Sequence, residues 1–178
     1  GSGWGWVCVP TVDPNSFCPS IQAKGWPALG KDEAHPMVNR AISACPPGST
    51  FKIVTALAGL RKKLATTRFN CSGGVSYGDH YFKCWIAEKG GAHGTLGLAD
   101  AIKVSCDSFF YQYGNAAGIE SMDVTGKMMG IGEESGINLT SGQAGSMPGP
   151  EWMRTHRPRE GWSQAQTANS SIGQGYDL

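Results

Sequence analysis

A serine and a lysine stand three residues apart in the segment CPPGSTFKIVTALAGL, residues 45–60. The apolar residues of this segment recur at helical spacing, and its Pro-Pro-Gly start is typical of the lead-in to a helix. Ser49 and Lys52 are therefore expected on one face of a helix, at its first turn. A serine hydroxyl becomes a nucleophile when a neighbouring base takes its proton, and a buried lysine can be that base. The helix N-terminus would add N–H groups suited to an oxyanion.

The same pair has a plain structural interpretation, in which Ser49 caps the helix and Lys52 is a solvated surface residue. On spacing alone that interpretation is favoured. A second segment, SCDSFFYQYG, changes the balance because it places Ser105 and Asp107 at the junction of two helical patterns. A second hydroxyl next to the lysine can pass a proton to a leaving group. The two segments together predict a serine nucleophile with a lysine base and a serine relay.

The elements that must position these residues are mostly helical. Apolar periodicity predicts helices over residues 51–60, 96–105, 107–118 and 120–130. We also expect a strand over 4–11, a short helical turn within 21–29, a small hairpin or knuckle over 68–94 and an irregular chain after Gly130. The aromatic residues of the third helix are expected to be core, namely Phe109, Phe110, Tyr111 and Tyr113.

Three cysteines and a histidine form a second chemical set: Cys71, Cys84, His93 and Cys106. Three thiolates and one imidazole make a closed tetrahedral zinc site, which leaves no position for water and is therefore structural. Cys106 stands between Ser105 and Asp107. A metal bound there would hold the relay serine in place.

Other chemistry remains open for these cysteines. They could pair as disulfides in an oxidising compartment or stay as free buried thiols. Asp79 and His80 are alternative ligands should Cys71 point away. The remaining three cysteines, Cys8, Cys18 and Cys45, show no partner pattern and are expected as buried small residues, with a Cys8–Cys18 disulfide as the lesser option.

Composition limits the function classes. The 178 residues fit one domain, and 15 basic against 14 acidic residues leave a formal net charge of +1. No run of like charges is present, so nucleic acid is not an expected partner. No apolar run reaches the roughly 18 residues of a membrane span, and the start GSGWGWVCVP does not read as a signal peptide. Any export or anchoring segment is expected outside this chain.

The segments PPGSTFK, SCDSFFYQ and GQGY, in this order, resemble the class B penicillin-binding proteins. The resemblance is strongest to the penicillin-binding protein 2 branch, the elongation-specific peptidoglycan D,D-transpeptidases. It extends to TVDPNSF, MPGPEW and SIGQGY, and so covers nearly the whole chain. It implies the α/β (α+β) fold shared by penicillin-binding-protein transpeptidases and serine β-lactamases, with the helical subdomain largely present.

One motif of this family is missing. No K-T-G or K-S-G follows Tyr176, and the reversed TGK at residues 125–127 is no substitute, because the motif belongs on a sheet strand. We therefore expect residues 1–178 to be a C-terminally truncated transpeptidase domain with an incomplete central antiparallel sheet. The fragment alone is expected to be inactive.

The resemblance also implies roles for the residues. Ser49 would be the acylated nucleophile, Lys52 its general base and Ser105 the proton relay, while Asp107 stands where many relatives have Asn. Relatives of penicillin-binding protein 2 can carry a zinc site at this place, which strengthens the prediction of a zinc knuckle embedded at residues 68–106.

The implied function is cross-linking of peptidoglycan stem peptides ending in D-Ala-D-Ala through a Ser49 acyl-enzyme, with inhibition by β-lactams. A membrane glycan polymerase of the elongation machinery is the implied partner. The implied location is the periplasmic face of the bacterial cytoplasmic membrane, reached through an N-terminal anchor helix outside this chain.

Two other functions compete with this one. STFKI and the YGN at residues 113–115 also resemble class D serine β-lactamases, although their spacing does not match. A non-enzymatic β-lactam sensor domain would share the acylation but not the turnover. The lifetime of a penicillin adduct separates the lactamase from the other two.

Overall fold

The computed structural model describes residues 7–18, 20, 25–134, 136 and 144–176. They divide into two compact units, one formed by the described residues up to Ala44 with Gly136, and the other by those from Cys45 to Glu134 and from Ala144 onward. The predicted nucleophile and all the predicted metal ligands belong to the second unit.

The first unit contains a 3₁₀ turn, η1 (Pro14–Phe17), and one helix, α1 (Gly25–Lys31). The strand expected over residues 4–11 is wrong in its described part, because residues 7–11 form no strand. Pro10 has no N–H to donate to a ladder, which opposes pairing there. Residues 4–6 lie outside the described part. The helix expected within residues 21–29 is present as α1, with 21–24 likewise outside the description.

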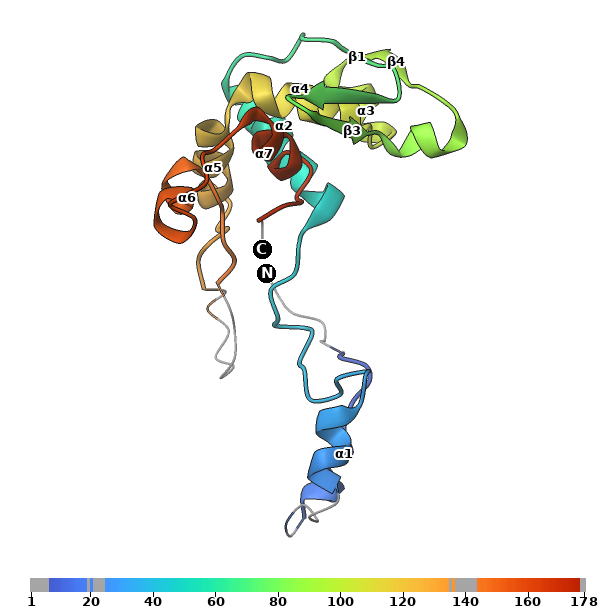
Figure 1. The fold of residues 1–178 in the computed structure, drawn as a ribbon, viewed down its shortest axis with the longest axis vertical. Helices are drawn as coiled ribbons and strands as arrows, with labels where there is room; N and C mark the ends of the chain where they lie inside the picture. Colours follow the sequence, from blue (N-terminus) through green and yellow to red (C-terminus); the bar gives the residue numbers. More distant parts are fainter. Residues whose placement is uncertain (1–6, 19, 21–24, 135, 137–143, 177–178) are drawn as a thin grey trace. The chain divides into compact units, whose positions relative to one another are not determined.

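The second unit is mainly helical (Figure 1). Its elements in chain order are η2 (Gly48–Phe51), α2 (Lys52–Arg61), β1 (Phe69–Cys71), β2 (Gly74–Tyr77), β3 (His80–Lys83), η3 (Trp85–Lys89), β4 (Gly94–Leu96), α3 (Leu98–Lys103), α4 (Asp107–Ala117), α5 (Ile119–Met128), α6 (Pro150–His156) and α7 (Gln164–Ser170).

The four helices predicted between residues 51 and 130 are confirmed as α2, α3, α4 and α5. The irregular chain predicted after Gly130 is wrong, because α6 and α7 form there. Pro150 occupies the first turn of α6, where its missing N–H costs nothing. Ser163 and Gln166 form a reciprocal capping box at the start of α7.

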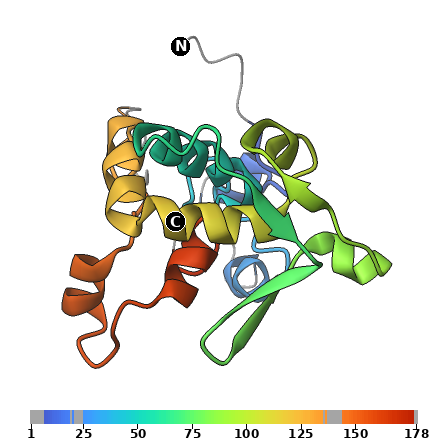
Figure 2. The ribbon, with the colours of Figure 1, turned by 90° about the horizontal axis from the view of Figure 1, so that it is seen from above.

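Helix α4 is the centre of the second unit. It passes between α2 and α7 (Figure 2), and it packs on both. Phe109, Phe110 and Tyr113 have no exposed surface, and Tyr111 is also buried, so the prediction that these aromatics are core is confirmed. Phe109 and Tyr113 stack with their ring centroids 5.2 Å apart.

Helix α2 buries part of its apolar set together with two polar side chains. Lys52 and Thr55 are buried, whereas the apolar Ile53, Leu57 and Leu60 are exposed. Thr55 Oγ1 donates to the Ser171 carbonyl at 2.7 Å, so a polar bond ties α2 to the end of α7. The polar side chains of α2 point inward because partners there satisfy them.

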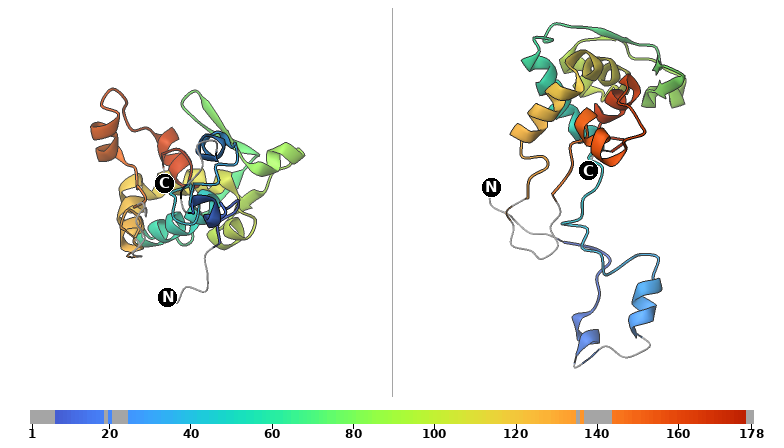
Figure 3. Two further views of the ribbon diagram at one scale, coloured as in Figure 1. Left: turned by 90° about the horizontal axis from the view of Figure 1, so that it is seen from below. Right: turned by 60° about the vertical axis from the view of Figure 1, so that its left-hand side comes forward.

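The strands form two antiparallel ladders, β1 with β4 and β2 with β3. Strands β1, β2 and β3 pack against α4, and α5 also contacts it. Figure 3 gives two further views, with the strands and η3 in green. Cys71 in β1 pairs with Gly94 in β4, which brings His93 next to Cys71. Strands β2 and β3 pair with each other and form the hairpin predicted within residues 68–94.

None of the helices in the described part of the chain combines the length and the apolar character that crossing a bilayer requires.

The loop after α7 fixes the start of the nucleophile segment. Gly48 N donates to the Gly173 carbonyl at 2.9 Å, and both glycines have positive φ, +56° and +68°. A Cβ on Gly173 would collide with the Gly48 carbonyl oxygen and lie 2.7 Å from Phe51 Cβ. Only glycine fits this approach of two backbones.

We expect Gly173→Ala to lower the free energy of unfolding by about 3 kcal/mol, because left-handed strain and a backbone clash add together. Gly130→Ala is the matched control, since Gly130 also has a positive φ, +85°, but a Cβ there meets nothing within 4 Å. It should cost only about 1 kcal/mol. Urea unfolding measures both values, and equal losses would contradict the proposed close approach.

Candidate active site and cysteine–histidine cluster

Ser49 lies in η2, immediately before α2, and its side chain is exposed. The residue at the N-cap of α2 is Phe51, so the interpretation of Ser49 as the helix cap is wrong. Lys52 is the first residue of α2 and is only 3 % exposed, so the interpretation of Lys52 as a surface charge is wrong too. An exposed hydroxyl thus stands one turn before a buried cation.

All three donors of the Lys52 ammonium are used. Nζ donates to the Ser105 carbonyl at 3.0 Å, to Ser105 Oγ at 2.9 Å and to Asp107 Oδ1 at 2.6 Å. Nζ also lies 5.6 Å from the centroid of the Phe110 ring. These partners replace the water that burial removes, and they all come from the segment between α3 and α4 or from α4 itself.

Ser105 connects the lysine to the exposed serine. Its hydroxyl accepts from Lys52 Nζ and donates to Ser49 Oγ at 3.3 Å. The two hydroxyls and the amine therefore form one hydrogen-bonded chain that can carry a proton in either direction. Ser105 has φ +50°, a left-handed conformation that a serine adopts only when its surroundings enforce it.

Asp107 begins α4 and uses both of its carboxylate oxygens. Oδ1 pairs with Lys52, and Oδ2 accepts from the backbone N–H of Trp85 at 3.0 Å. The side chains of this ion pair are 4 % and 15 % exposed. Trp85 was not singled out from the sequence. The sequence feature that could have indicated Trp85 is its position next to Cys84, because Trp85 links the cysteine segment to the Ser105 loop.

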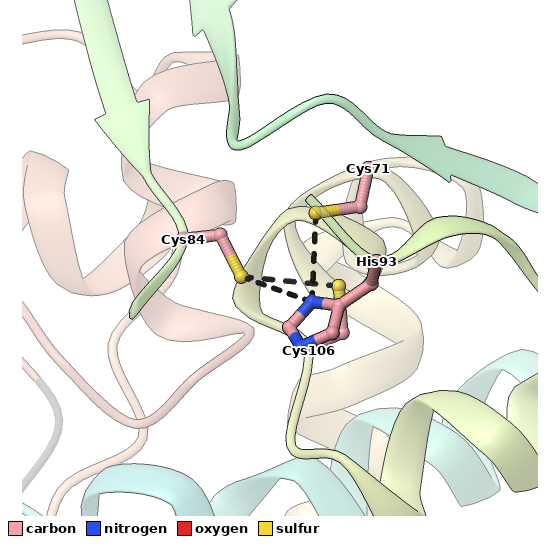
Figure 4. Close-up of side chains that lie close together, drawn as sticks. All are labelled: Cys71, Cys84, His93 and Cys106. Atoms are coloured by element: carbon pink, nitrogen blue, oxygen red, sulfur yellow. Dashed lines mark hydrogen bonds between the residues drawn. The ribbon is translucent and has the colours of Figure 1, made fainter. Parts of the chain in front are cut away.

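The four predicted metal ligands converge, as Figure 4 shows. Their ligand atoms all lie within 4.8 Å of one another. His93 Nδ1 is 3.6 Å from both Cys71 Sγ and Cys84 Sγ, and Cys84 Sγ is 3.9 Å from Cys106 Sγ. Ligands at ~2.3 Å (S) and ~2.0 Å (N) from a tetrahedral zinc would be separated by about 3.8 Å (S to S) and about 3.5 Å (S to N). The donor set and its spacing fit such an ion.

Local structure explains the convergence. The β1–β4 register brings Cys71 and His93 together, and Cys84 follows β3, with its backbone N–H donating to the Gly73 carbonyl at 2.8 Å. Cys106 is the N-cap of α4, and its Sγ accepts from the Phe109 N–H at 3.4 Å. Two ladders and one helix start thus deliver the four side chains.

The cysteine sulfurs affect one another's ionisation. Burial raises the pKa of the Cys106 thiol well above its ordinary range, and the neighbouring Cys84 and Cys71 sulfurs add to that rise. Burial also acts to raise the pKa of Cys71, but hydrogen bonds from the backbone N–H groups of His93 and Gly73 and from the side chains of Ser108 and His93 together outweigh it, and that pKa falls to about 6. Ionising all three thiols at this spacing would require a cation to compensate their charge.

The disulfide alternative is not formed. All six cysteines are free thiols, and the 3.9 Å between Cys84 Sγ and Cys106 Sγ exceeds the ~2.05 Å of a disulfide bond. Cys71 points into the cluster. His80, an alternative ligand, packs instead on Phe82, with the two ring centroids 4.3 Å apart.

The expectation that the other three cysteines are buried is wrong. Cys18 and Cys45 are exposed and Cys8 is half-buried. Each lies in an irregular segment, outside the helices and strands that bury the cluster cysteines.

Known proteins match this chain closely. Residues 6–178 match the family described as the penicillin binding protein transpeptidase domain. The peptidoglycan D,D-transpeptidase MrdA of Acinetobacter baumannii is 35 % identical over 175 residues, which are 95 % of this chain and 25 % of that protein. The chain thus spans about a quarter of the length of the curated relatives it matches.

Solved structures agree on the fold. The complex of penicillin-binding protein PBP2 with MreC from Helicobacter pylori matches with a TM-score of 0.86 and 31 % identity, over 96 % of this chain and 32 % of that one. The penicillin G acyl-enzyme of penicillin-binding protein A from Mycobacterium tuberculosis matches with a TM-score of 0.77 and 27 % identity, over 97 % and 39 %.

The expected α/β (α+β) transpeptidase fold, with its helical part present and only small antiparallel ladders, is confirmed by these matches. The sequence segments that suggested the family also build the serine–lysine chain of hydrogen bonds. The chain belongs to the penicillin-binding protein transpeptidase domain family.

Proposed function

We propose that this chain is part of a peptidoglycan D,D-transpeptidase. Ser49 Oγ would attack the carbonyl carbon of the penultimate D-Ala of a stem peptide, and the amide bond to the terminal D-Ala would break, so that this residue leaves as the free amine. An amino group of a second stem peptide would then take the acyl group and restore the Ser49 hydroxyl. The observation that carries this proposal is the hydrogen-bonded chain from Ser49 Oγ through Ser105 Oγ to Lys52 Nζ.

The roles follow from that chain of hydrogen bonds. Lys52 would first give up one ammonium proton, and the resulting amine would accept the proton that Ser49 loses during attack. Ser105 lies between the two groups and would return the proton to the leaving amine. The Asp107 carboxylate pairs with Lys52 Nζ and holds it against Ser105. The fragment is proposed to be inactive alone, since the K-T-G motif that relatives use does not occur in it.

The relatives support the wider proposal. One is a peptidoglycan D,D-transpeptidase by name, and the M. tuberculosis structure is a penicillin G acyl-enzyme, so β-lactams are proposed to acylate Ser49. The PBP2 of H. pylori was solved with MreC. We propose that the protein works at the periplasmic face of the cytoplasmic membrane, held by an anchor helix, together with a glycan polymerase of the elongation machinery.

The cluster of Cys71, Cys84, His93 and Cys106 is proposed to hold a structural Zn²⁺. The spacing of its four ligand atoms and their burial support this choice. The ion would neutralise the thiolates and crosslink the ladders to the start of α4. Cys106 is adjacent to both Ser105 and Asp107, so the crosslink would steady the relay loop. The knuckle would span residues 68–106.

A fluorescent penicillin tests the nucleophile in the full-length protein. We expect a stable covalent adduct on the wild type and none on Ser49→Ala. Thr50→Ala is the matched control, because Thr50 is the adjacent exposed hydroxyl, already bonded to the Pro47 carbonyl at 2.7 Å; its adduct should persist. Labelling of Ser49→Ala would contradict the assignment. An adduct that hydrolyses within seconds would identify a β-lactamase, and a stable adduct without transpeptidation of stem peptides would identify a sensor.

Elemental analysis of protein purified without chelator tests the metal. We expect about one equivalent of zinc in the wild type and a large loss in Cys106→Ser, because a hydroxyl is a much poorer zinc ligand than a thiolate. Cys45→Ser removes an exposed cysteine outside the cluster and should keep the full content. Less than about half an equivalent in the wild type would contradict the proposal.

A further inference from the structure

Trp85 is a large side chain that does not serve the core. It is 40 % exposed, and it begins η3 directly after Cys84. An exposed tryptophan usually leaves its N–H groups to water, but both N–H groups of Trp85 are used within the protein.

The two bonds of Trp85 reach both sides of Ser105. Its indole Nε1 donates to the Val104 carbonyl at 3.1 Å, and its backbone N donates to Asp107 Oδ2 at 3.0 Å. Val104 precedes Ser105, and Asp107 lies two residues after it. One residue outside the loop therefore holds the chain before and after the relay hydroxyl.

Ser105 needs such support. Its φ of +50° is a left-handed conformation that is unfavourable for a residue with a Cβ atom. The other backbone bonds of this turn are local to the end of α3: Ser105 N donates to the Ile102 carbonyl and Cys106 N to the Ala101 carbonyl. Trp85 adds a restraint on this turn from a segment distant in sequence. Lys52 Nζ donates to both the carbonyl and the hydroxyl of Ser105 in the same turn.

The indole is itself fixed from the other side. The His93 ring lies with its centroid 5.3 Å from that of Trp85, at an interplanar angle of 60°, and Lys89 Nζ lies 5.2 Å from the indole. The ring thus bridges the cysteine–histidine cluster and the Val104 carbonyl.

The geometry points to Trp85 as a positioning residue for the acylation of Ser49. It holds the backbone around Ser105 in the left-handed conformation that places the relay hydroxyl between Lys52 Nζ and Ser49 Oγ. This inference rests on the proposed function, because that function assigns Ser105 to proton transfer. It adds a residue, Trp85, and a contact, the bond to the Val104 carbonyl, that the proposed function does not include.

The test measures acylation by penicillin in the full-length protein, with the saturating rate separated from the non-covalent binding constant. Trp85→Phe keeps an aromatic ring and loses the indole N–H. We expect the saturating rate to fall by about two- to tenfold, the effect of one neutral hydrogen bond, with the binding constant and the zinc content unchanged. Replacement of Trp85 by 3-benzothienylalanine, which has the shape of indole without the N–H, should give the same loss if Trp85→Phe folds poorly.

Trp162→Phe is the matched control. Trp162 Nε1 also donates a hydrogen bond, to Thr167 Oγ1 at 2.8 Å, but at the start of α7. It should affect the melting temperature and leave the acylation rate within twofold of the wild type. An equal loss of rate in both variants would show a general structural effect and overturn the inference.

A double-mutant cycle separates positioning from general damage. In a Ser105→Ala background the relay hydroxyl is absent, so Trp85→Phe should have no further effect on the acylation rate. The same fold loss in both backgrounds would overturn the inference. If the wild type is not acylated at Ser49, the proposed function fails; if the wild type is acylated and Trp85→Phe matches it, only the role of Trp85 fails.

Discussion

The buried ammonium of Lys52 is the constraint on which the site depends. A charge that is 3 % exposed must recover by hydrogen bonds what it loses in hydration, and an ammonium has three donors to satisfy. Ser105 supplies two acceptors and Asp107 the third. Holding these oxygens around Nζ also places the Ser105 hydroxyl beside Ser49, so the energetic requirement of the lysine and the geometry of proton transfer have the same solution.

The rest of the second unit secures those acceptors. Helix α4 begins at Asp107 and is held in the core by Phe109, Phe110 and Tyr113. The cysteine–histidine cluster reaches the same helix start through Cys106, and Trp85 binds the chain on both sides of Ser105. On the opposite side, the Gly173 backbone fixes Gly48 just before the nucleophile. Separate segments thus converge on residues 48–52 and 104–107.

The chemistry of the site could be predicted from residue types, but its supports could not. Residue type alone indicates the chemistry of Ser49, Lys52 and Ser105 and of the four cluster residues. The structure brings the members of each set together. Trp85 and Gly173 act mainly through N–H groups and close backbone approach, which depend on tertiary contacts that no local pattern contains. The burial of Lys52 and Thr55 could not be predicted for the same reason, because both are buried where distant acceptors meet them.

The dependence of Lys52 on its acceptors can be measured through the unfolding free energies of two aspartate variants. Asp107→Ala removes one acceptor of the buried ammonium and should lower the unfolding free energy by about 3 kcal/mol, while Asp107→Asn, which keeps an oxygen acceptor, should lose less. Asp123→Ala breaks the exposed Lys127–Asp123 pair, at 2.8 Å and with 64 % and 27 % exposure, and should change it by no more than about 0.5 kcal/mol. Equal and small losses for Asp107→Ala and Asp123→Ala would show that the buried Lys52 does not depend on its acceptors.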